Sequence, residues 1–526
     1  MQSKTLAILA LLATMTLAGC KNDDPASAQQ PEPPAKKTAE TAEEVLSQIP
    51  GVIVIQNTLD AKGNPVTYFY FEQLIDHEDA SAGTFLQYCV LHYKGPDHLT
   101  VLHTQGYSVF EPDVYQVLPL ATNLDANFIE VEHRYHRRSL INFVANETDC
   151  TGDYWKYNTA AQSTADLHTI VTALRATGCF ENKWVSTGNI KNGILTSLYA
   201  YFYPNEMDLY VPFCAPFCVG KNSEGIGKWL TQRCGLENGN NTELRNDIWA
   251  AFRRMASDAS LQNEIAALYN LDHHSNYSVE SIMRYILYSF MENLFYKFSY
   301  NKTSQWDALI PRPEYSAEVY YRFALLGKQD YAIKLNELRQ LVGLENMAID
   351  SFEDDSEYMM MDEDEPFDAQ QAGRRVAPQY LNTDKLVREI YFVHAAKELG
   401  YFGYDFSVLP ENHLLSENSV SWLKTYGSID KHTSKYGVTF DDGKLMKDFL
   451  EFIRNNRYNN KCKMLFIYAD NDPWSGAAIP DPDADDPYIK KHMVTDGVHS
   501  PWINSPAQYS TEERDWIMNA VNEMLQ

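Results

Sequence analysis

The chain has few positive charges for its size. Lys and Arg number 44, and Asp and Glu number 71, in 526 residues, which gives a formal net charge of −27. Nucleic acids and anionic membrane faces bind proteins through clustered positive charge, so this balance argues against both as partners. The same acidity is typical of secreted or surface proteins. With 44% hydrophobic and 13% aromatic residues, the chain is expected to fold into a packed globular protein.

The N-terminal region lacks an apolar run long enough to cross a membrane. Its apolar stretch runs from Leu6 to Leu17, after Lys4, whereas a spanning helix needs about 20 apolar residues. A short charged region, an apolar stretch and small residues before a cleavage point form the pattern of a secretory signal. The ending Leu17-Ala-Gly-Cys20 resembles a bacterial lipobox. This resemblance implies a signal peptide over 1–19 and lipid attachment at Cys20.

Residues 20–45 are predicted to form a lipidated cysteine followed by a disordered tether. They are rich in Ala, Pro, Gln, Lys and Glu and poor in large apolar side chains. Lys21-Asn-Asp-Asp24 resembles the export signal of surface-exposed lipoproteins. We therefore expect a cell-envelope lipoprotein, anchored in the outer membrane and either periplasmic or surface-exposed, that meets the membrane only through the lipid on Cys20. The alternative is an ordinary signal peptide with a chance cysteine.

Cysteine is scarce, and its spacing does not indicate a metal site. Seven cysteines remain after Cys20, an odd number, so at least one thiol stays outside any disulfide. They are Cys89, Cys150, Cys179, Cys214, Cys218, Cys234 and Cys462. Cys214 and Cys218 lie four residues apart but have no accompanying set of Cys and His residues. His273-His274 likewise has no ligand partner at metal spacing. The sequence thus predicts no metal and no cofactor.

Two segments concentrate acidic residues. Roughly nine of the sixteen residues 353–368 are Asp or Glu, which predicts a solvated, disordered loop. Binding of a basic partner or gating of a substrate is the alternative role for this segment. Pro480-Asp-Pro-Asp-Ala-Asp-Asp-Pro487 has spaced carboxylates of the kind that bind Ca²⁺. It lacks the Gly and the terminal Glu of a calcium loop, so a rigid acidic loop is favoured.

Strand and helix patterns predict an α/β core interrupted by a helical insertion. An antiparallel start to the sheet is indicated by β-rich runs at 52–56, 66–71, 85–93 and 99–103. Strands and helices then alternate, as in a parallel α/β sheet, over 127–132, 160–176, 184–186, 194–202 and 207–212. Residues 225–345 have helix-like patterns, and the α/β signal resumes at 447–453, 464–468 and 511–525. We predict a core in two parts, 46–216 and 441–526, with a helical cap over 217–440.

The chain has isoleucine where its pattern leads one to expect a serine. Residues 183–193 are predicted to form a strand, a sharp turn at Ile190 and a helix. Asp472 follows the strand 464–468, and His499 lies in a loop before the last helix. Nucleophile, acid and base in this order form the triad of α/β-hydrolases. The fold class is therefore predicted to be α/β, an α/β-hydrolase core sheet with a large inserted helical cap.

Several motifs together resemble the secreted bacterial tripeptidyl aminopeptidase family of serine peptidases, which are α/β-hydrolases related to prolyl carboxypeptidases. The motifs are His103-Thr-Gln-Gly-Tyr107, Val131-Glu-His-Arg-Tyr135, Trp184-Val-Ser-Thr-Gly188, Val211-Pro-Phe-Cys-Ala-Pro216, Asn471-Asp-Pro-Trp-Ser475 and Asp496-Gly-Val-His-Ser500. They occur in the family's order across residues 50–526.

The resemblance assigns roles to individual residues. It implies a triad acid at Asp472 and a base at His499. It further implies backbone oxyanion donors near Tyr107 and at Lys191. Glu132 and Arg134 are expected near the site, where Glu132 would meet the free amino end of a substrate.

The departure from the family lies at the turn. The family pattern is Ser-Thr-Gly-x-Ser-Lys-Gly-Gly, and this chain has Ser186-Thr-Gly-Asn-Ile-Lys-Asn-Gly193. Lys191 fixes the register, so Ile190 occupies the nucleophile position. Such a turn holds its nucleophile at positive φ, where a β-branched residue is an outlier. We therefore expect a relaxed or shifted turn in which Asn189 or Asn192 takes the unfavourable dihedral.

Two functions remain open from the sequence. The first is a catalytically inactive homologue that binds peptides or a protein partner. The alternative is an active serine-type tripeptidyl or dipeptidyl aminopeptidase that hydrolyses peptide N-termini, through another nucleophile or a water activated by Asp472 and His499.

Overall fold

The computed structural model describes most of the chain. The described residues are 39–110, 115–141, 152–233, 242–300, 307–326, 331–344, 390–400, 403–426, 436–495, 497–499, 503 and 509–526. The predicted signal peptide, Cys20, most of the tether, Cys150, Cys234 and the acidic segment 353–368 lie outside them. Among the described helices, none has both the length and the apolar character needed to cross a membrane.

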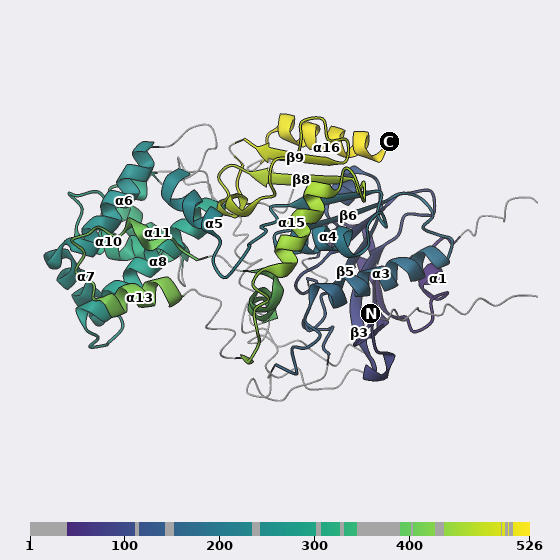
Figure 1. Cartoon of the computed structure of the whole chain (residues 1–526), viewed down its shortest axis with the longest axis horizontal. Helices are drawn as coiled ribbons and strands as arrows, with labels where there is room; N and C mark the ends of the chain where they lie inside the picture. The colour runs from purple at the N-terminus through teal and green to yellow at the C-terminus, as the bar shows by residue number, and fades with distance from the viewer. Residues whose placement is uncertain are drawn as a thin grey trace, which may run out of the picture. The chain divides into compact units, whose positions relative to one another are not determined.

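One nine-stranded sheet forms the α/β part (Figure 1). Its strands are β1 (Ile53–Leu59), β2 (Pro65–Leu74), β3 (Thr84–His92), β4 (Thr100–Thr104), β5 (Asn127–Val131), β6 (Trp184–Asn189), β7 (Leu209–Phe213), β8 (Met464–Ala469) and β9 (Ile489–Val494). Their order is β1-β2-β3-β5-β4-β6-β7-β8-β9. The pairs from β1 to β5 are antiparallel, and those from β5 onward are parallel. The predicted antiparallel start is confirmed for the first three runs, but the fourth run, 99–103, is wrong in this respect, because β4 pairs parallel with both β5 and β6.

Helices cover both faces of the sheet, and the fold is that of an α/β-hydrolase. The helices of this part are α1 (Ala42–Leu46), α2 (Pro119–Asn123), α3 (Ala160–Ala176), α4 (Lys191–Phe202), α15 (Lys444–Asn455) and α16 (Thr511–Leu525). Apolar side chains of α3, α4 and α15 share one core cluster with the sheet, and those of α2 and α16 share another. Burial on both faces explains why every residue of β4, β5, β7 and β8 is buried.

Strand β9 was not predicted from the sequence, because it lies at the edge of the sheet. This strand is the last one in the described sheet, where it pairs with β8, and its four central residues are half-buried. Its sequence, Ile489-Lys-Lys-His-Met-Val494, therefore has neither a buried apolar run nor a clear alternation.

A helical insertion separates β7 from β8. Its helices are α5 (Glu224–Lys228), α6 (Thr242–Ser257), α7 (Ala259–Asp272), α8 (Val279–Tyr300), α10 (Ala317–Ala324), α11 (Tyr331–Leu341) and α13 (Glu417–Tyr426). Between β7 and β8 the chain also forms the short helical turns η3 (Trp229–Arg233), η4 (Asp307–Leu309), η6 (Ala395–Leu399) and η7 (Phe406–Val408). Two further short turns lie outside this interval, η1 (Ala80–Ala82) and η8 (Pro473–Ala477). The longer helices of the insertion group together in Figure 1 and share a separate apolar core.

One segment inside the predicted cap range packs with the α/β part instead. Ile390 and Val393 belong to a small core cluster with Tyr135 and Trp155. Leu399, at the end of η6, belongs to the apolar core that α3, α4 and α15 share with the sheet. This segment therefore contacts residues around β5 and α3, next to the candidate site.

Candidate active site

The turn between β6 and α4 has the backbone of a strained elbow. Ile190 lies between the two elements with φ 55° and ψ −117°. Its N–H donates to the Phe213 carbonyl at 3.0 Å, and its own carbonyl accepts from the Ile194 N–H at 2.9 Å. A Cβ on Gly188 would lie 2.5 Å from the Asn192 carbonyl carbon, so strand and helix touch here.

The expectation of a relaxed or shifted turn is wrong. Ile190 itself takes the positive φ, whereas Asn189 and Asn192 do not appear among the residues with positive φ. The physical reason is that the two hydrogen bonds of Ile190 and the close contact at Gly188 determine this backbone from both sides. A β-branched residue in such a region costs about 1–3 kcal/mol and persists only where its surroundings over-determine it.

Asn192 connects the turn to the loop after β4. Its Oδ1 accepts from the Gly106 N–H at 2.6 Å, and its Nδ2 lies 3.2 Å from His103 Nε2. His103 Nδ1 in turn lies 3.0 Å from Glu130 Oε1. Since the amide donates to Nε2, the proton of His103 is on Nδ1 and is donated to Glu130.

The same carboxylate also organises the loop that carries the predicted oxyanion donor. Gln105 Nε2 donates to Glu130 Oε1 at 2.8 Å, and Gln105 Oε1 accepts from the Tyr107 N–H at 3.2 Å. The N–H groups of Gly106 and Tyr107 therefore already donate to side chains of the protein. This buried network was not predicted, because nothing in the local pattern relates Glu130 to Asn192.

Lys191 places a buried amine beside the turn. Its side chain is fully buried, and its Nζ donates to the Gly106 carbonyl at 2.6 Å. Burial lowers the pKa of Lys191 to about 7. Three further buried bases, all histidines, lie close enough for the charge of Lys191 to act on them. For two of them, His133 and His136, burial and then the charge of Lys191 lower the pKa well below the usual value of histidine.

The third of these bases comes from the segment that returns to the α/β part. Burial lowers the pKa of His394 to about 4, and the His394 ring centroid lies 5.6 Å from that of His133. This cluster of histidines was not predicted from the sequence. A signal for part of it was present, since His133 and His136 lie three residues apart directly after β5.

The structure brings Asp472 and His499 together. Asp472 Oδ2 lies 2.7 Å from His499 Nδ1, and both side chains are completely buried. Asp472 Oδ1 accepts from the Trp474 N–H at 3.0 Å, which fixes the carboxylate on the turn after β8. β6, β7 and β8 are parallel, so their carboxyl ends meet at one edge of the sheet, where ligands of open α/β sheets bind.

The helical insertion reaches this acid turn. The ring of Phe295, on α8, packs edge-on against Trp474 with centroids 4.8 Å apart. Trp474 in turn lies 5.8 Å from the His499 ring. The insertion thus contacts Trp474, the ring that lies next to the base.

Glu132 is engaged inside the protein. Its side chain is fully buried and accepts hydrogen bonds from the Val109 N–H at 3.0 Å and the Arg138 N–H at 2.7 Å. The hydroxyl of Ser139 adds a third at 3.1 Å. Burial raises the pKa of Glu132, although these donors and the Arg138 charge oppose the shift.

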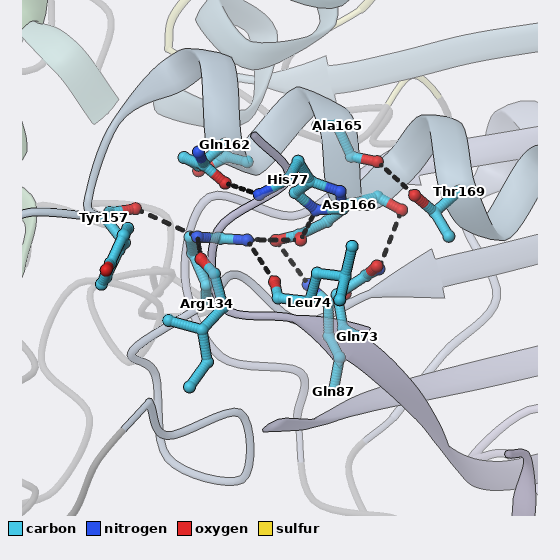
Figure 2. Close-up of polar contacts among 12 residues, drawn as sticks. Gln73, Leu74, His77, Gln87, Arg134, Tyr157, Gln162, Ala165, Asp166 and Thr169 are labelled. Atoms are coloured by element: carbon cyan, nitrogen blue, oxygen red, sulfur yellow. Dashed lines mark hydrogen bonds and ion pairs between the residues drawn. The ribbon is translucent and has the colours of Figure 1, made fainter. Parts of the chain in front are cut away.

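Arg134 holds β5's end to α3. Figure 2 shows its guanidinium facing Asp166, with Nε to Oδ2 at 2.8 Å and Nη2 to Oδ1 at 2.6 Å. The same group donates to the carbonyls of Leu74, Ile75 and Tyr157. Arg134 is fully buried, so these contacts give it a structural role at this position.

Comparison with known proteins gives one family and one curated relative. Residues 35–290 match the family PS-10 peptidase S37. A prolyl tri/tetrapeptidyl aminopeptidase of Streptomyces mobaraensis is 26% identical over 231 residues, which cover 44% of this chain and 45% of that protein. The chain thus matches less than half the length of this relative.

Solved structures also align with the chain, at low scores. VinJ is 10% identical, with 84% of this chain and 96% of that chain covered and a TM-score of 0.30. Homoserine O-acetyltransferase of Staphylococcus aureus is 9% identical, with 90% and 93% covered and a TM-score of 0.30. The fold class follows from the sheet order and its covering helices, to which likenesses at these scores add nothing.

Proposed function

We propose that this chain, a homologue of the S37 family of serine peptidases, is a catalytically silent member that binds peptides or a protein partner. The observation that carries the proposal is Ile190, whose side chain has no atom able to attack a carbonyl and which lies on the strained turn between β6 and α4. Acyl transfer by this class of site needs an oxygen or sulfur nucleophile at that turn.

The two hydroxyls on β6 just before the turn, those of Ser186 and Thr187, do not replace the missing one. Ser186 is completely buried within β6, four residues before the turn. The Thr187 hydroxyl donates to the Val211 carbonyl of the adjacent strand at 2.8 Å. Loss of a serine nucleophile lowers kcat by about six orders of magnitude in a well-studied serine peptidase, so the expected residual rate is negligible.

Asn192 adds a second obstacle to acyl transfer. Its Oδ1 takes the Gly106 N–H in the loop where the family resemblance places an oxyanion donor. An amide oxygen bound there would compete with a developing oxyanion for the same donor. The turn therefore has no nucleophile, and in the adjoining loop the Gly106 N–H is already occupied by the Asn192 side chain.

The proposed ligand is a short peptide with a free amino end. The curated relative is named for prolyl tripeptides and tetrapeptides. A chain with a net charge of −27 favours a positively charged amino end over an anionic ligand. In this proposal Glu132 and Arg134 support the wall of the site through their internal contacts.

Localisation is part of the proposal. The lipobox-like Leu17-Ala-Gly-Cys20 supports a lipoprotein of the cell envelope, attached through Cys20. Metabolic labelling with a fatty-acid analogue should tag the wild-type protein and leave Cys20→Ala untagged. Equal labelling of both would rule out the anchor.

Activity-based labelling tests the proposal that the protein has no peptidase activity. The wild-type protein should not react with a fluorophosphonate probe and should not cleave tripeptide naphthylamides. Ile190→Ser supplies the missing oxygen and should react with the probe. Labelling of the wild-type protein that is abolished by His499→Ala would show an active site and overturn the proposal.

Calorimetric titration tests peptide binding independently. A prolyl tripeptide with a free amino end should bind the wild-type protein, and its N-acetylated form should bind at least about tenfold more weakly because the positive charge is gone. Equal affinity for both forms, or no heat with either, would contradict the proposed ligand class.

A further inference from the structure

We propose that Cys214, Asp472 and His499 form a buried binding site for a zinc-like divalent cation. The Cys214 sulfur, a carboxylate oxygen of Asp472 and a ring nitrogen of His499 all lie within 4.8 Å of one another. All three residues are buried, with exposed fractions of 1%, 0% and 0%. Within the part of the chain that the structure describes, this is the one group of three such ligands that meets so closely.

The fold brings the three residues together from distant parts of the chain. Cys214 follows β7 directly, and Asp472 follows the neighbouring parallel strand β8 after a short turn. The Cys214 N–H donates to the Ile467 carbonyl of β8 at 2.8 Å, and its φ is 47°. This contact ties the cysteine's backbone to the strand that leads to the acid.

The ligand types suit zinc. Thiolate sulfur, imidazole nitrogen and carboxylate oxygen are the three donor classes of protein zinc sites. Metal–ligand bonds of about 2.0–2.3 Å place tetrahedral ligand atoms about 3.5 Å apart. The present separations do not exceed 4.8 Å, so the three ligand atoms need to move closer by only about 1 Å at most. Asp472 Oδ2 and His499 Nδ1 are 2.7 Å apart, so their hydrogen bond must break if these two atoms are to bind one ion.

Charge balance favours a divalent ion at this depth. A cysteine thiolate and the Asp472 carboxylate contribute two negative charges, and a neutral His499 contributes none, so a divalent cation makes the site neutral. Binding converts the Cys214 thiol into a metal-bound thiolate, and the thiol proton passes to the solvent. The neutral assembly avoids the large cost of an isolated buried charge.

This site revises the sequence prediction of no metal. Cysteine spacing alone paired Cys214 with Cys218, which supplies no ligand to this group. The actual partners are residues that the family resemblance assigned to acid–base chemistry. Three protein ligands leave a fourth position for water or a ligand atom, as in zinc sites that are open to small molecules. The inference goes beyond the proposed function, because it depends on this geometry and not on the missing nucleophile.

Cobalt spectroscopy on the full-length protein tests the site. After treatment with a chelator, the protein is equilibrated with Co²⁺, whose bond to a thiolate absorbs in the near ultraviolet. We expect the band to saturate at one equivalent and to disappear when Zn²⁺ displaces Co²⁺. Cys214→Ser should abolish the band, whereas Asp472→Asn should weaken Co²⁺ binding at least about tenfold.

Cys218→Ser is the matched control, since Cys218 is also a buried thiol only four residues away. It should keep both the band and the affinity. Circular dichroism confirms that each variant is folded, and Zn²⁺ should raise the unfolding temperature of the wild-type protein but not of Cys214→Ser. Absence of the band in the folded wild-type protein, or its persistence in Cys214→Ser, would overturn the proposal. None of these readouts depends on peptidase activity, so they fail or succeed separately from the proposed function.

Discussion

The turn at Ile190 and the Asp472–His499 pair lie at the same edge of the sheet but have kept different properties. The turn keeps the strained backbone without a reactive atom. The pair keeps its reactive atoms in contact, 2.7 Å apart and fully buried. The difference shows that the strained backbone of this turn does not require a serine at residue 190.

The two regions differ in the interactions that stabilise them: backbone contacts at the turn, and side-chain contacts in the Asp472–His499 pair. Backbone hydrogen bonds to Phe213 and Ile194 and the contact between Gly188 and Asn192 determine the turn, and none of them involves the side chain of residue 190. The pair, in contrast, exists only through two side chains. A single substitution can therefore remove the chemistry of the turn and leave its shape.

The largest expected effect comes from restoring chemistry to the turn. Ile190→Ser should react with a fluorophosphonate, and adding Asn192→Gly should increase the rate by a further factor of about 100, because it frees the Gly106 N–H for the oxyanion. Labelling rates are compared for both variants, with Asn192→Gly alone as the control that should stay unreactive. If the single and double variants react equally fast, Asn192 is no obstacle.

A pH series tests the buried amine at the turn. The pKa of Lys191 is about 7 in the folded protein, below its ordinary value of 10.5, so between these values the unfolded state binds the extra proton. The unfolding free energy should therefore rise with pH above about 7, by up to about 1.4 kcal/mol per pH unit, through this residue. Lys191→Met should lose that contribution in urea unfolding between pH 7 and 9.

Lys228→Met, at an exposed position of α5, is the control for this series and should keep the wild-type slope. An unchanged slope in Lys191→Met would mean that the amine is charged and solvated in the folded protein, against its observed burial.

The pair can be tested as a structural element. Asp472→Asn removes the charge from a buried hydrogen bond to His499 and should lower the unfolding free energy by about 1.5–3 kcal/mol. Asp481→Asn is the control, because Asp481 is 89% exposed and pairs with Lys491 at the surface. Urea unfolding at pH 7 should show no more than about 0.5 kcal/mol for the control. Equal effects would mean that the buried contact contributes nothing to folding.

The smallest expected effect measures the strain at the turn. At ordinary helix or strand positions glycine is less stable than alanine by about 0.5–1 kcal/mol. At residue 190 the order should reverse, with Ile190→Gly more stable than Ile190→Ala by about 1 kcal/mol, because glycine accepts positive φ. Ala173→Gly, within α3, should show the usual order. The usual order at residue 190 would show that the backbone there is not strained.

Much of the fold could be predicted from local patterns. Helix α3 lies at 160–176 and α16 at 511–525, as their apolar periodicity indicated, and the order of strands and helices follows the prediction. Edge strand β9 was missed because half-buried positions leave no clear period. The motif order also located Ile190, Asp472 and His499 within the chain.

The contacts that define the site could not be predicted in the same way. The sequence determined the elements, the turn and the residue types at the sheet edge, because periodicity and motifs record local backbone preference and burial. Only the tertiary structure decided that Ile190 keeps the positive φ, that Asn192 bonds the Gly106 N–H, and that Arg134 pairs with Asp166. It also placed Cys214 beside the Asp472–His499 pair. These contacts join segments that are far apart in the chain, and close packing between neighbouring strands and helices sets them, which no local pattern encodes.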